Sequence, residues 1–402
     1  MINKLKKLKP IKGIKLSSIS SGMYKKKRLD LSLMEISDGS SIAGVFTINK
    51  GRSDTINISE KNLKKTNPKF IIVNSGNANA GTGKEGFNDI IKYSKVLANI
   101  ANCKIDDILD YSTGIIGESK KYKNIIDSLP NIIKNLSDNG WEAFSKSILT
   151  TDTTVKKISK TISLSGKKIN ISGVTKGSGM IMPNMATMLS FVATDIKISK
   201  SILIKILKKI TEKSFNMITV DGETSTNDAS ILISTGKSST NFNNLKKNEK
   251  DLFLNTLENI YKDLAKMIVK DGEGATKFIT INVKNTATFS DAKKIAMSIA
   301  KSPLVKTAIF AEDPNWGRIL SAIGNVKTKV KDLSKIEIYI GNFLVFKDNQ
   351  INKNYVENRV KKYLKNDNVV ITIKYNSGKQ SATVWTTDLT YEYIKINAEY
   401  RT

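Results

Sequence analysis

Residues 176–189 read Lys-Gly-Ser-Gly-Met-Ile-Met-Pro-Asn-Met-Ala-Thr-Met-Leu. Two glycines and a proline predict an irregular loop, and the apolar run over 188–194 predicts a buried strand directly after Thr187. A small residue, Ala186, followed by Thr187 at the start of a strand is the arrangement that self-cleavage requires. The Thr187 hydroxyl attacks the Ala186 carbonyl, the peptide shifts to an ester, and hydrolysis frees an α-amine beside the hydroxyl. From these residues alone, an ordinary junction between loop and strand remains the alternative.

The chain has 402 residues and no histidine, and Cys103 is its only cysteine. These counts exclude Ser-His-Asp and Cys-His nucleophile pairs, histidine-ligated metals, internal disulfides and thiolate clusters. An enzyme of this composition needs another base for its nucleophile. The α-amine of a cleaved chain, with a pKa of about 7.7–8.0, could take the proton of the Thr187 hydroxyl.

A formal net charge of +28 arises from 65 Lys+Arg against 37 Asp+Glu. Such a charge is typical of a nucleic-acid binder. However, only five of the basic residues are arginine, the residue that makes bidentate contacts to bases and phosphates, and the lysines are spread along the chain. We therefore expect a solvated lysine surface and no nucleic-acid partner.

The chain lacks an apolar stretch of 18 residues, and the basic residues 1–28 lack the continuous apolar run of a signal peptide. We expect a cytoplasmic protein that does not span a membrane.

Strand and helix patterns alternate along the chain, so the expected fold class is α/β, or layered α+β. The length predicts two or three units, or one large body with two lobes. Strands are predicted at 29–36, 43–48, 70–73, 169–174, 188–194, 229–234, 278–283, 336–340, 369–375 and 381–385, and helices at 87–101, 122–136, 200–213, 251–269, 291–301 and 355–365. Residues 237–250, rich in Asn and Lys, are expected to form a polar linker or surface insertion.

Three further segments contain residues that often bind ligands. Residues 81–86 fit the pattern G-x-G-x-x-G, but seven residues separate them from the preceding strand, which favours a turn before a helix over a dinucleotide site. The carboxylates of residues 221–228 lack the spacing of a calcium loop and favour a turn. Residues 271–277 resemble another turn, in which flanking glycines could leave Glu273 open to a ligand.

Motifs along nearly the whole chain resemble the ornithine acetyltransferase family, the bifunctional glutamate N-acetyltransferase/amino-acid acetyltransferase of arginine biosynthesis. The similar segments lie at 43–47, 74–80, 112–117, 150–153, 176–195, 218–222, 271–277, 304–308, 313–318 and 396–402.

The resemblance implies an ornithine acetyltransferase/aminopeptidase-like fold and self-cleavage between Ala186 and Thr187. Residues 1–186 would form an α chain and 187–402 a β chain, and the two would stay associated as an (αβ)2 heterotetramer. Thr187 would take the acetyl group of N2-acetylornithine, release ornithine, and pass the acetyl group to glutamate. An amidase or aminopeptidase on the same scaffold, with water as acceptor, is the alternative.

By the same resemblance, Thr113 and Gly114 would form the oxyanion hole. The residues that match the substrate-binding positions of the family are Thr153, Lys176, Thr187, Glu273, Asn397 and Thr402. We expect small-molecule substrates, no metal and no bound cofactor. Whether acetyl-CoA also serves as an acetyl donor is left open.

Overall fold

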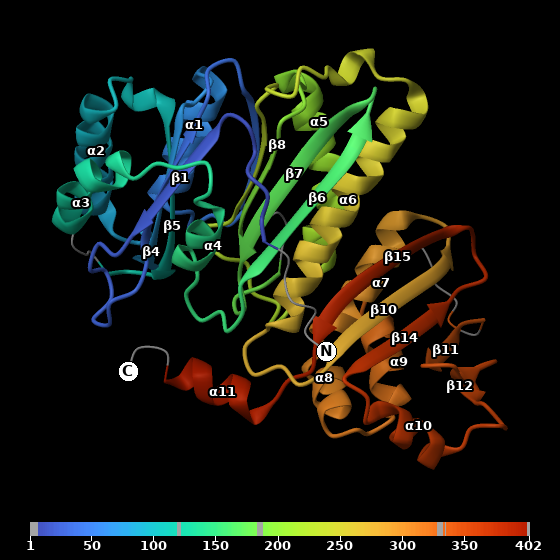
Figure 1. Ribbon diagram of the computed structural model, residues 1–402. Coiled ribbons are helices and arrows are strands. Elements are labelled where there is room, and N and C mark those ends of the chain that lie inside the picture. Colours follow the sequence, from blue (N-terminus) through green and yellow to red (C-terminus); the bar gives the residue numbers. More distant parts are fainter. Residues whose placement is uncertain (1–6, 119–121, 183–187, 328–332, 334, 400–402) are drawn as a thin grey trace. The chain divides into compact units, whose positions relative to one another are not determined.

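The computed structural model describes residues 7–118, 122–182, 188–327, 333 and 335–399. The described chain forms two compact units, which are treated separately here (Figure 1). Unit 1 comprises residues 7–177, 188–216 and 224–268, and unit 2 comprises residues 178–182, 217–223 and 269–399. No helix among the described residues is long and apolar enough to cross a membrane.

Unit 1 contains two mixed β-sheets. The first has the order β1-β2-β4-β5 and consists of β1 (Ile14–Ile19), β2 (Leu31–Ile36), β4 (Phe70–Asn77) and β5 (Ile108–Ile115), of which β4 and β5 are parallel. The second has the order β3-β9-β8-β7-β6 and consists of β3 (Ser41–Phe46), β9 (Ala229–Ser234), β8 (Leu189–Thr194), β7 (Lys167–Lys176) and β6 (Lys156–Leu164). Strands β8 and β9 are parallel neighbours.

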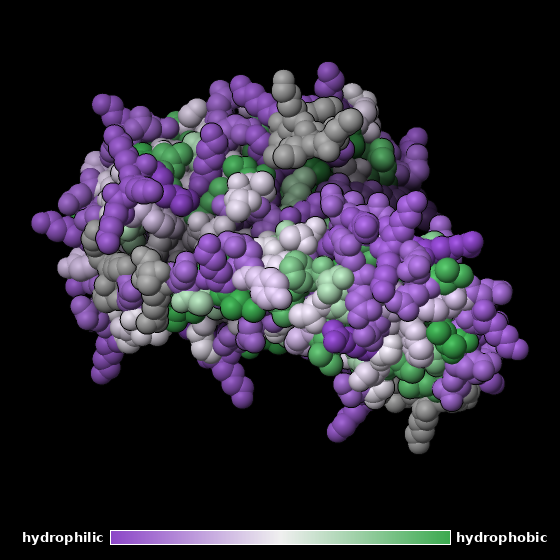
Figure 2. Space-filling model, turned by 90° about the horizontal axis from the view of Figure 1, so that it is seen from below, coloured by the Kyte–Doolittle hydropathy of each residue, from purple (hydrophilic) through white to green (hydrophobic). Residues whose placement is uncertain are grey.

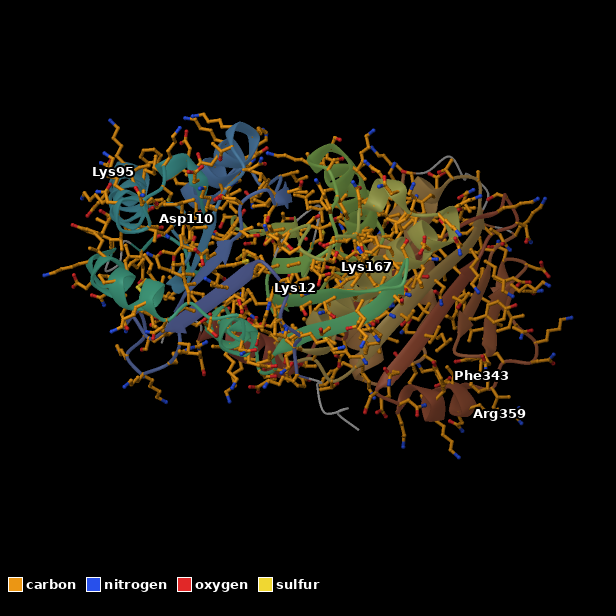
Figure 3. The ribbon with its side chains drawn as sticks, turned by 45° about the horizontal axis from the view of Figure 1, so that its top comes forward. Lys12, Lys95, Asp110, Lys167, Phe343 and Arg359 are labelled. Carbon is orange, nitrogen blue, oxygen red and sulfur yellow. The ribbon has the colours of Figure 1, made fainter. Side chains whose placement is uncertain are left out.

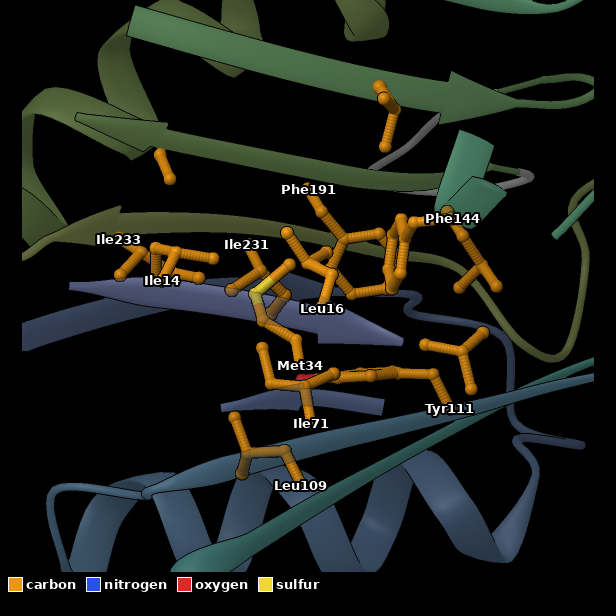
Figure 4. Packing of buried hydrophobic residues seen from close by; sticks show 14 of the residues in the cluster. Ile14, Leu16, Met34, Ile71, Leu109, Tyr111, Phe144, Phe191, Ile231 and Ile233 are labelled. Carbon is orange, nitrogen blue, oxygen red and sulfur yellow. The ribbon is translucent and has the colours of Figure 1, made fainter. Parts of the chain in front are cut away.

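The apolar faces of these two sheets form one core (Figure 4). Tyr111 of β5 and Phe191 of β8 meet edge to face with ring centroids 5.5 Å apart, and Phe144 packs against Phe191 at 5.3 Å. A second cluster joins the opposite face of the first sheet to helices, which gives layered packing. The helices of unit 1 are α1 (Asp54–Lys65), α2 (Gly83–Ile100), α3 (Tyr122–Lys134), α4 (Trp141–Ser147), α5 (Lys200–Glu212) and α6 (Lys247–Lys270), whose last two residues belong to unit 2.

Unit 2 has a single sheet with the order β13-β12-β11-β14-β10-β15. Its strands are β10 (Phe278–Thr286), β11 (Glu337–Ile340), β12 (Phe343–Lys347), β13 (Gln350–Ile351), β14 (Asn368–Lys374) and β15 (Gln380–Thr387). Its helices are α7 (Phe289–Lys301), α8 (Pro303–Phe310), α9 (Trp316–Gly324), α10 (Glu357–Leu364) and α11 (Tyr391–Ala398).

The expectation of a layered α/β protein is confirmed. Among the described residues, however, five strands (β1, β5, β6, β12 and β13) and five helices (α1, α4, α8, α9 and α11) were not predicted, and the prediction for residues 237–250 is wrong. Strand β5 was not predicted, because its sequence Ile-Leu-Asp-Tyr-Ser-Thr-Gly-Ile interrupts the apolar run with polar residues. Residues 237–250 are not a plain linker: Phe242 and Leu245 are buried, and α6 already begins at Lys247. Two isolated apolar side chains that enter a core give no periodic pattern, so the polar composition was misleading.

Strand β8 begins two residues after Thr187 and pairs with β7, which lies on the other side of the expected cleavage site. The expected α and β chains therefore both contribute strands to the same sheet.

Most lysines lie on the surface. Hydrophilic side chains dominate the face shown in Figure 2, and the lysines labelled in Figure 3, namely Lys12, Lys95 and Lys167, are exposed. Four lysines among the described residues are buried instead, namely Lys156, Lys176, Lys277 and Lys306. A buried ammonium group is costly unless it is paired or hydrogen-bonded. These four lysines therefore mark places where the fold supplies polar or charged partners.

Candidate active site

Thr113 and Gly114, the expected oxyanion-hole residues, lie near the end of β5 in unit 1. The parallel ladder to β4 shifts its register beside them, between Gly76 and Asn77. Gly114 has a φ of +135°, and a Cβ added to it would lie 2.5 Å from the carbonyl carbon of Gly76. Only glycine fits here, because both the backbone conformation and the close approach of β4 exclude a side chain.

Lys176, the last residue of β7, reaches Thr113 with its side chain. Its Nζ donates to Thr113 Oγ1 at 3.1 Å and to Thr150 Oγ1 at 2.8 Å. The Thr113 side chain is itself buried. Two residues that are 63 positions apart in the sequence, and that the family resemblance assigned to one site, are thus hydrogen-bonded to each other.

Asp152 organises the buried lysines around this contact. Its Oδ1 lies 2.6 Å from Lys156 Nζ and accepts from the Gly177 N–H at 2.7 Å, while its Oδ2 lies 3.9 Å from Lys176 Nζ. Burial by itself would raise the pKa of Asp152, but the ammonium groups of Lys176 and Lys156 hold that pKa below its ordinary value. Asp152 is therefore a carboxylate that orients both ammonium groups.

A second group of expected site residues lies within unit 2. The buried Glu273 accepts a hydrogen bond at its Oε2 from Asn397 Nδ2 of α11, over 3.0 Å. The backbone of Gly179 packs on the same carboxylate, since a Cβ there would lie 2.3 Å from Glu273 Oε2. The structure thus brings together Glu273 and Asn397, which the resemblance assigned to substrate binding.

Asp221 holds the segment that leads toward the expected cleavage site. Its Oδ2 accepts from the Met180 N–H at 2.6 Å and its Oδ1 from the Ile181 N–H at 2.8 Å. The Tyr393 hydroxyl donates to Asp221 Oδ2 at 3.3 Å. Burial, together with the negative charges of Asp221 and Glu273, raises the pKa of Tyr393, so this hydroxyl stays a donor.

Lys306 is enclosed by carbonyl and hydroxyl oxygens of unit 2. Its Nζ donates to Val220 O at 2.8 Å, Thr387 O at 2.5 Å and Thr387 Oγ1 at 3.0 Å. Burial lowers the pKa of Lys306 to about 8, although the carboxylates of Asp388 and Asp221 counteract part of this effect. Lys306 thereby ties the residues beside Asp221 to the end of β15.

The remaining predicted site residues take no part in the contacts described above. Thr153 is exposed and directly follows Asp152. Ala186, Thr187 and Thr402 lie outside the described residues.

The turns predicted at 221–228 and 271–277 are confirmed, whereas in the segment 81–86 only residues 81–82 precede the helix and Gly83 already begins α2. Residues 221–228 precede β9, and residues 271–277 connect α6 to β10.

Sequence reasoning assigned no role to Thr150, Asp152, Asp221 or Tyr393. Asp152 and Asp221 stood in segments already singled out, but nothing in their spacing reveals which backbone amides and ammonium groups they meet.

Comparison with known proteins shows to which family the chain is similar. The ArgJ family model matches residues 15–402. The "Arginine biosynthesis bifunctional protein ArgJ" of Pseudomonas fluorescens is 39% identical over 398 residues, covering 98% of each chain, and that of Colwellia psychrerythraea is 42% identical over 98% of this chain and 97% of its own. The crystal structure of the arginine biosynthesis bifunctional protein argJ from Bacillus halodurans is 38% identical, covers 51% of this chain and 96% of its own, and superposes with a TM-score of 0.48.

Proposed function

Because this chain belongs to the ArgJ family, we propose that it is a self-cleaving glutamate N-acetyltransferase of arginine biosynthesis. It takes the acetyl group of N2-acetylornithine, releases ornithine and transfers the acetyl group to glutamate. The structural observation that carries this proposal is the 3.1 Å hydrogen bond from Lys176 to Thr113, which joins two residues expected to serve the same reaction.

Thr187 is the proposed nucleophile. Cleavage after Ala186 would free its α-amine, which with a pKa of about 7.7–8.0 is partly neutral near pH 8 and can accept the hydroxyl proton. The hydroxyl oxygen then attacks the acetyl carbonyl, and the protonated amine returns its proton to the leaving ornithine amine. A chain without histidine has no imidazole that could perform this step.

Thr113 and Gly114 are the proposed oxyanion donors. An ammonium group only donates hydrogen bonds, so the contact with Lys176 makes Thr113 Oγ1 an acceptor and directs its own proton elsewhere. The Thr113 hydroxyl can then donate this proton in a hydrogen bond to the negatively charged oxygen of a tetrahedral intermediate. Removal of one such donor typically costs about 3–4 kcal/mol of transition-state stabilisation.

Buried charged side chains are the proposed determinants of substrate recognition. N-acetylornithine and glutamate each carry an α-carboxylate, for which the Lys176 ammonium is the proposed partner. Ornithine also carries an ammonium group, for which the buried Glu273 carboxylate is the proposed partner. Asn397, which contacts Glu273, is proposed to orient this carboxylate and to bind substrate with Thr153 and Thr402.

Three further properties remain predictions. They are assembly as an (αβ)2 heterotetramer, a cytoplasmic location, and the possible use of acetyl-CoA as a second acetyl donor.

The deciding experiment incubates the purified protein with N-acetylornithine and isotope-labelled glutamate. We expect labelled N-acetylglutamate and ornithine in equal amounts. Free acetate as the main product would instead support the amidase alternative, because water would then be the acceptor. A parallel reaction with acetyl-CoA in place of N-acetylornithine tests the second donor.

A further inference from the structure

Asn227 is a buried side chain that no step of the proposed reaction uses. Its Nδ2 lies 2.6 Å from Ala78 O, 2.9 Å from Ser112 O and 3.0 Å from Ser112 Oγ. Its Oδ1 accepts from the Thr226 hydroxyl at 2.5 Å. This amide orientation is the one that gives both carbonyl oxygens a donor, so the side chain is fixed by its neighbours.

The two carbonyls flank the expected oxyanion donors. Ser112 directly precedes Thr113, and its carbonyl belongs to the peptide whose N–H is that of Thr113. Ala78 follows Asn77, which pairs with Thr113 and Ile115, and the Ala78 N–H donates to Ile115 O at 3.0 Å. Asn227 therefore connects β4 and β5 on either side of the segment 113–114.

This stretch needs such a connection because its ladder is irregular. The register shifts between Gly76 and Asn77, and Gly114 adopts a φ of +135°. A regular parallel ladder would hold neighbouring strands by evenly spaced backbone bonds. Where the ladder is interrupted, side-chain donors determine the backbone conformation.

The same short segment also contacts the strand that follows the expected nucleophile. Two residues after Asn227, the Ala229 N–H donates to Met188 O at 3.0 Å, and β9 continues as the parallel neighbour of β8. Residues 227–229 thus hydrogen-bond to the residue directly before Thr113 and to the residue directly after Thr187.

We propose that Asn227 is a positioning residue, which sets the Thr113 and Gly114 donors relative to the strand that begins after Thr187. This inference rests on the proposed acetyl transfer. It predicts that the loss of the Asn227 amide lowers kcat. Misplaced oxyanion donors reduce the stabilisation of the transition state more than they reduce the affinity for the substrate.

The test compares Asn227→Asp and Asn227→Ala with a matched control, Asn62→Asp. Asn62 is also buried in unit 1, and its Nδ2 donates at 3.0 Å to Ile108 O, at the opposite end of β5. The kcat, the KM for N-acetylornithine and the thermal midpoint are measured, with kcat normalised to the cleaved fraction found by denaturing mass spectrometry.

We expect both Asn227 variants to lose about tenfold or more in kcat, with KM within about threefold, and Asn62→Asp to keep kcat at a similar loss of thermal midpoint. Wild-type kcat in the Asn227 variants would overturn the proposal. So would equal kcat losses in all three variants, since they would reflect stability alone. Failure of the proposed function is recognised separately, because the wild-type protein would then form no N-acetylglutamate.

Discussion

Lys176 Nζ lies 3.1 Å from Thr113 Oγ1, and the Asp152 carboxylate lies between this lysine and a second buried lysine, Lys156. One carboxylate thus sets the orientation of two ammonium groups at the end of β7. This arrangement explains how two lysines can be buried at the proposed substrate site.

Asp152→Asn is expected to destabilise the protein by about 3–5 kcal/mol, because the buried ammonium groups lose their carboxylate while the side-chain shape is kept. Thermal or urea unfolding measures this change. Glu357→Gln is the control: it breaks an exposed ion pair with Lys361 and should cost less than about 1 kcal/mol. Similar losses in the two variants would contradict the assigned role of Asp152.

Gly114→Ala is expected to abolish transfer activity and to destabilise unit 1. The added Cβ would lie 2.5 Å from Gly76 C, at a φ that disfavours any L side chain. The control is Gly324→Ala at the end of α9, where a Cβ meets nothing within 4 Å. That variant should keep wild-type stability within about 0.5 kcal/mol. Full activity in Gly114→Ala would rule out a tightly packed oxyanion segment.

Glu273→Gln tests the proposed ammonium partner. We expect KM for N-acetylornithine to rise about tenfold or more, because a neutral amide loses a charge-assisted contact of about 1.5–3 kcal/mol. The Asn397 contact can persist, since glutamine retains an acceptor oxygen at this position. Glu392→Gln, an exposed change on α11, should leave KM unaltered. An unchanged KM in Glu273→Gln would remove Glu273 from substrate binding.

Thr187→Ala is expected to remain a single inactive chain of 44.5 kDa, because the hydroxyl that attacks the Ala186 carbonyl is missing. Denaturing mass spectrometry shows whether the chain is cut, and Thr187→Ser, which retains a hydroxyl, is the matched control that should still cleave. A cleaved or active Thr187→Ala protein would disprove the nucleophile assignment.

We expect the stability of the fold to depend on pH through the buried carboxyl group of Asp110. Its side chain, labelled in Figure 3, is buried on β5, and burial raises its pKa to about 8. In the unfolded chain the same group ionises near pH 4. Between pH 4 and pH 8 the folded state therefore binds the extra proton, so this group lowers the stability of the fold as the pH rises.

Asp110→Asn should remove that dependence and raise stability at pH 8 by a few kcal/mol, roughly 1.4 kcal/mol per unit of pKa shift, with little change at pH 4. Thermal midpoints between pH 4 and pH 8 measure the effect. Asp127→Asn, the same type of substitution at an exposed position on α3, should show no such trend. Parallel curves for the wild type and Asp110→Asn would contradict the prediction.

The sequence alone predicted the fold class and most buried strands, and it supplied the candidate site residues. Apolar periodicity reports burial directly, and the missing histidine restricted the choice of nucleophile and base. Motif resemblance then assigned roles to Thr113, Lys176 and Glu273. These properties depend on residue type and local spacing, which a linear sequence contains.

Only the tertiary structure decided how these residues are oriented. Strand β5 escaped prediction because Asp110, Ser112 and Thr113 are polar residues whose hydrogen bonds are satisfied by distant parts of unit 1 or whose charge is suppressed by burial. The partners of Asp152 and Asn227 likewise come from segments remote in sequence. Hydrogen bonding and burial depend on which segments meet in space, and that proximity has no periodic signature along the chain.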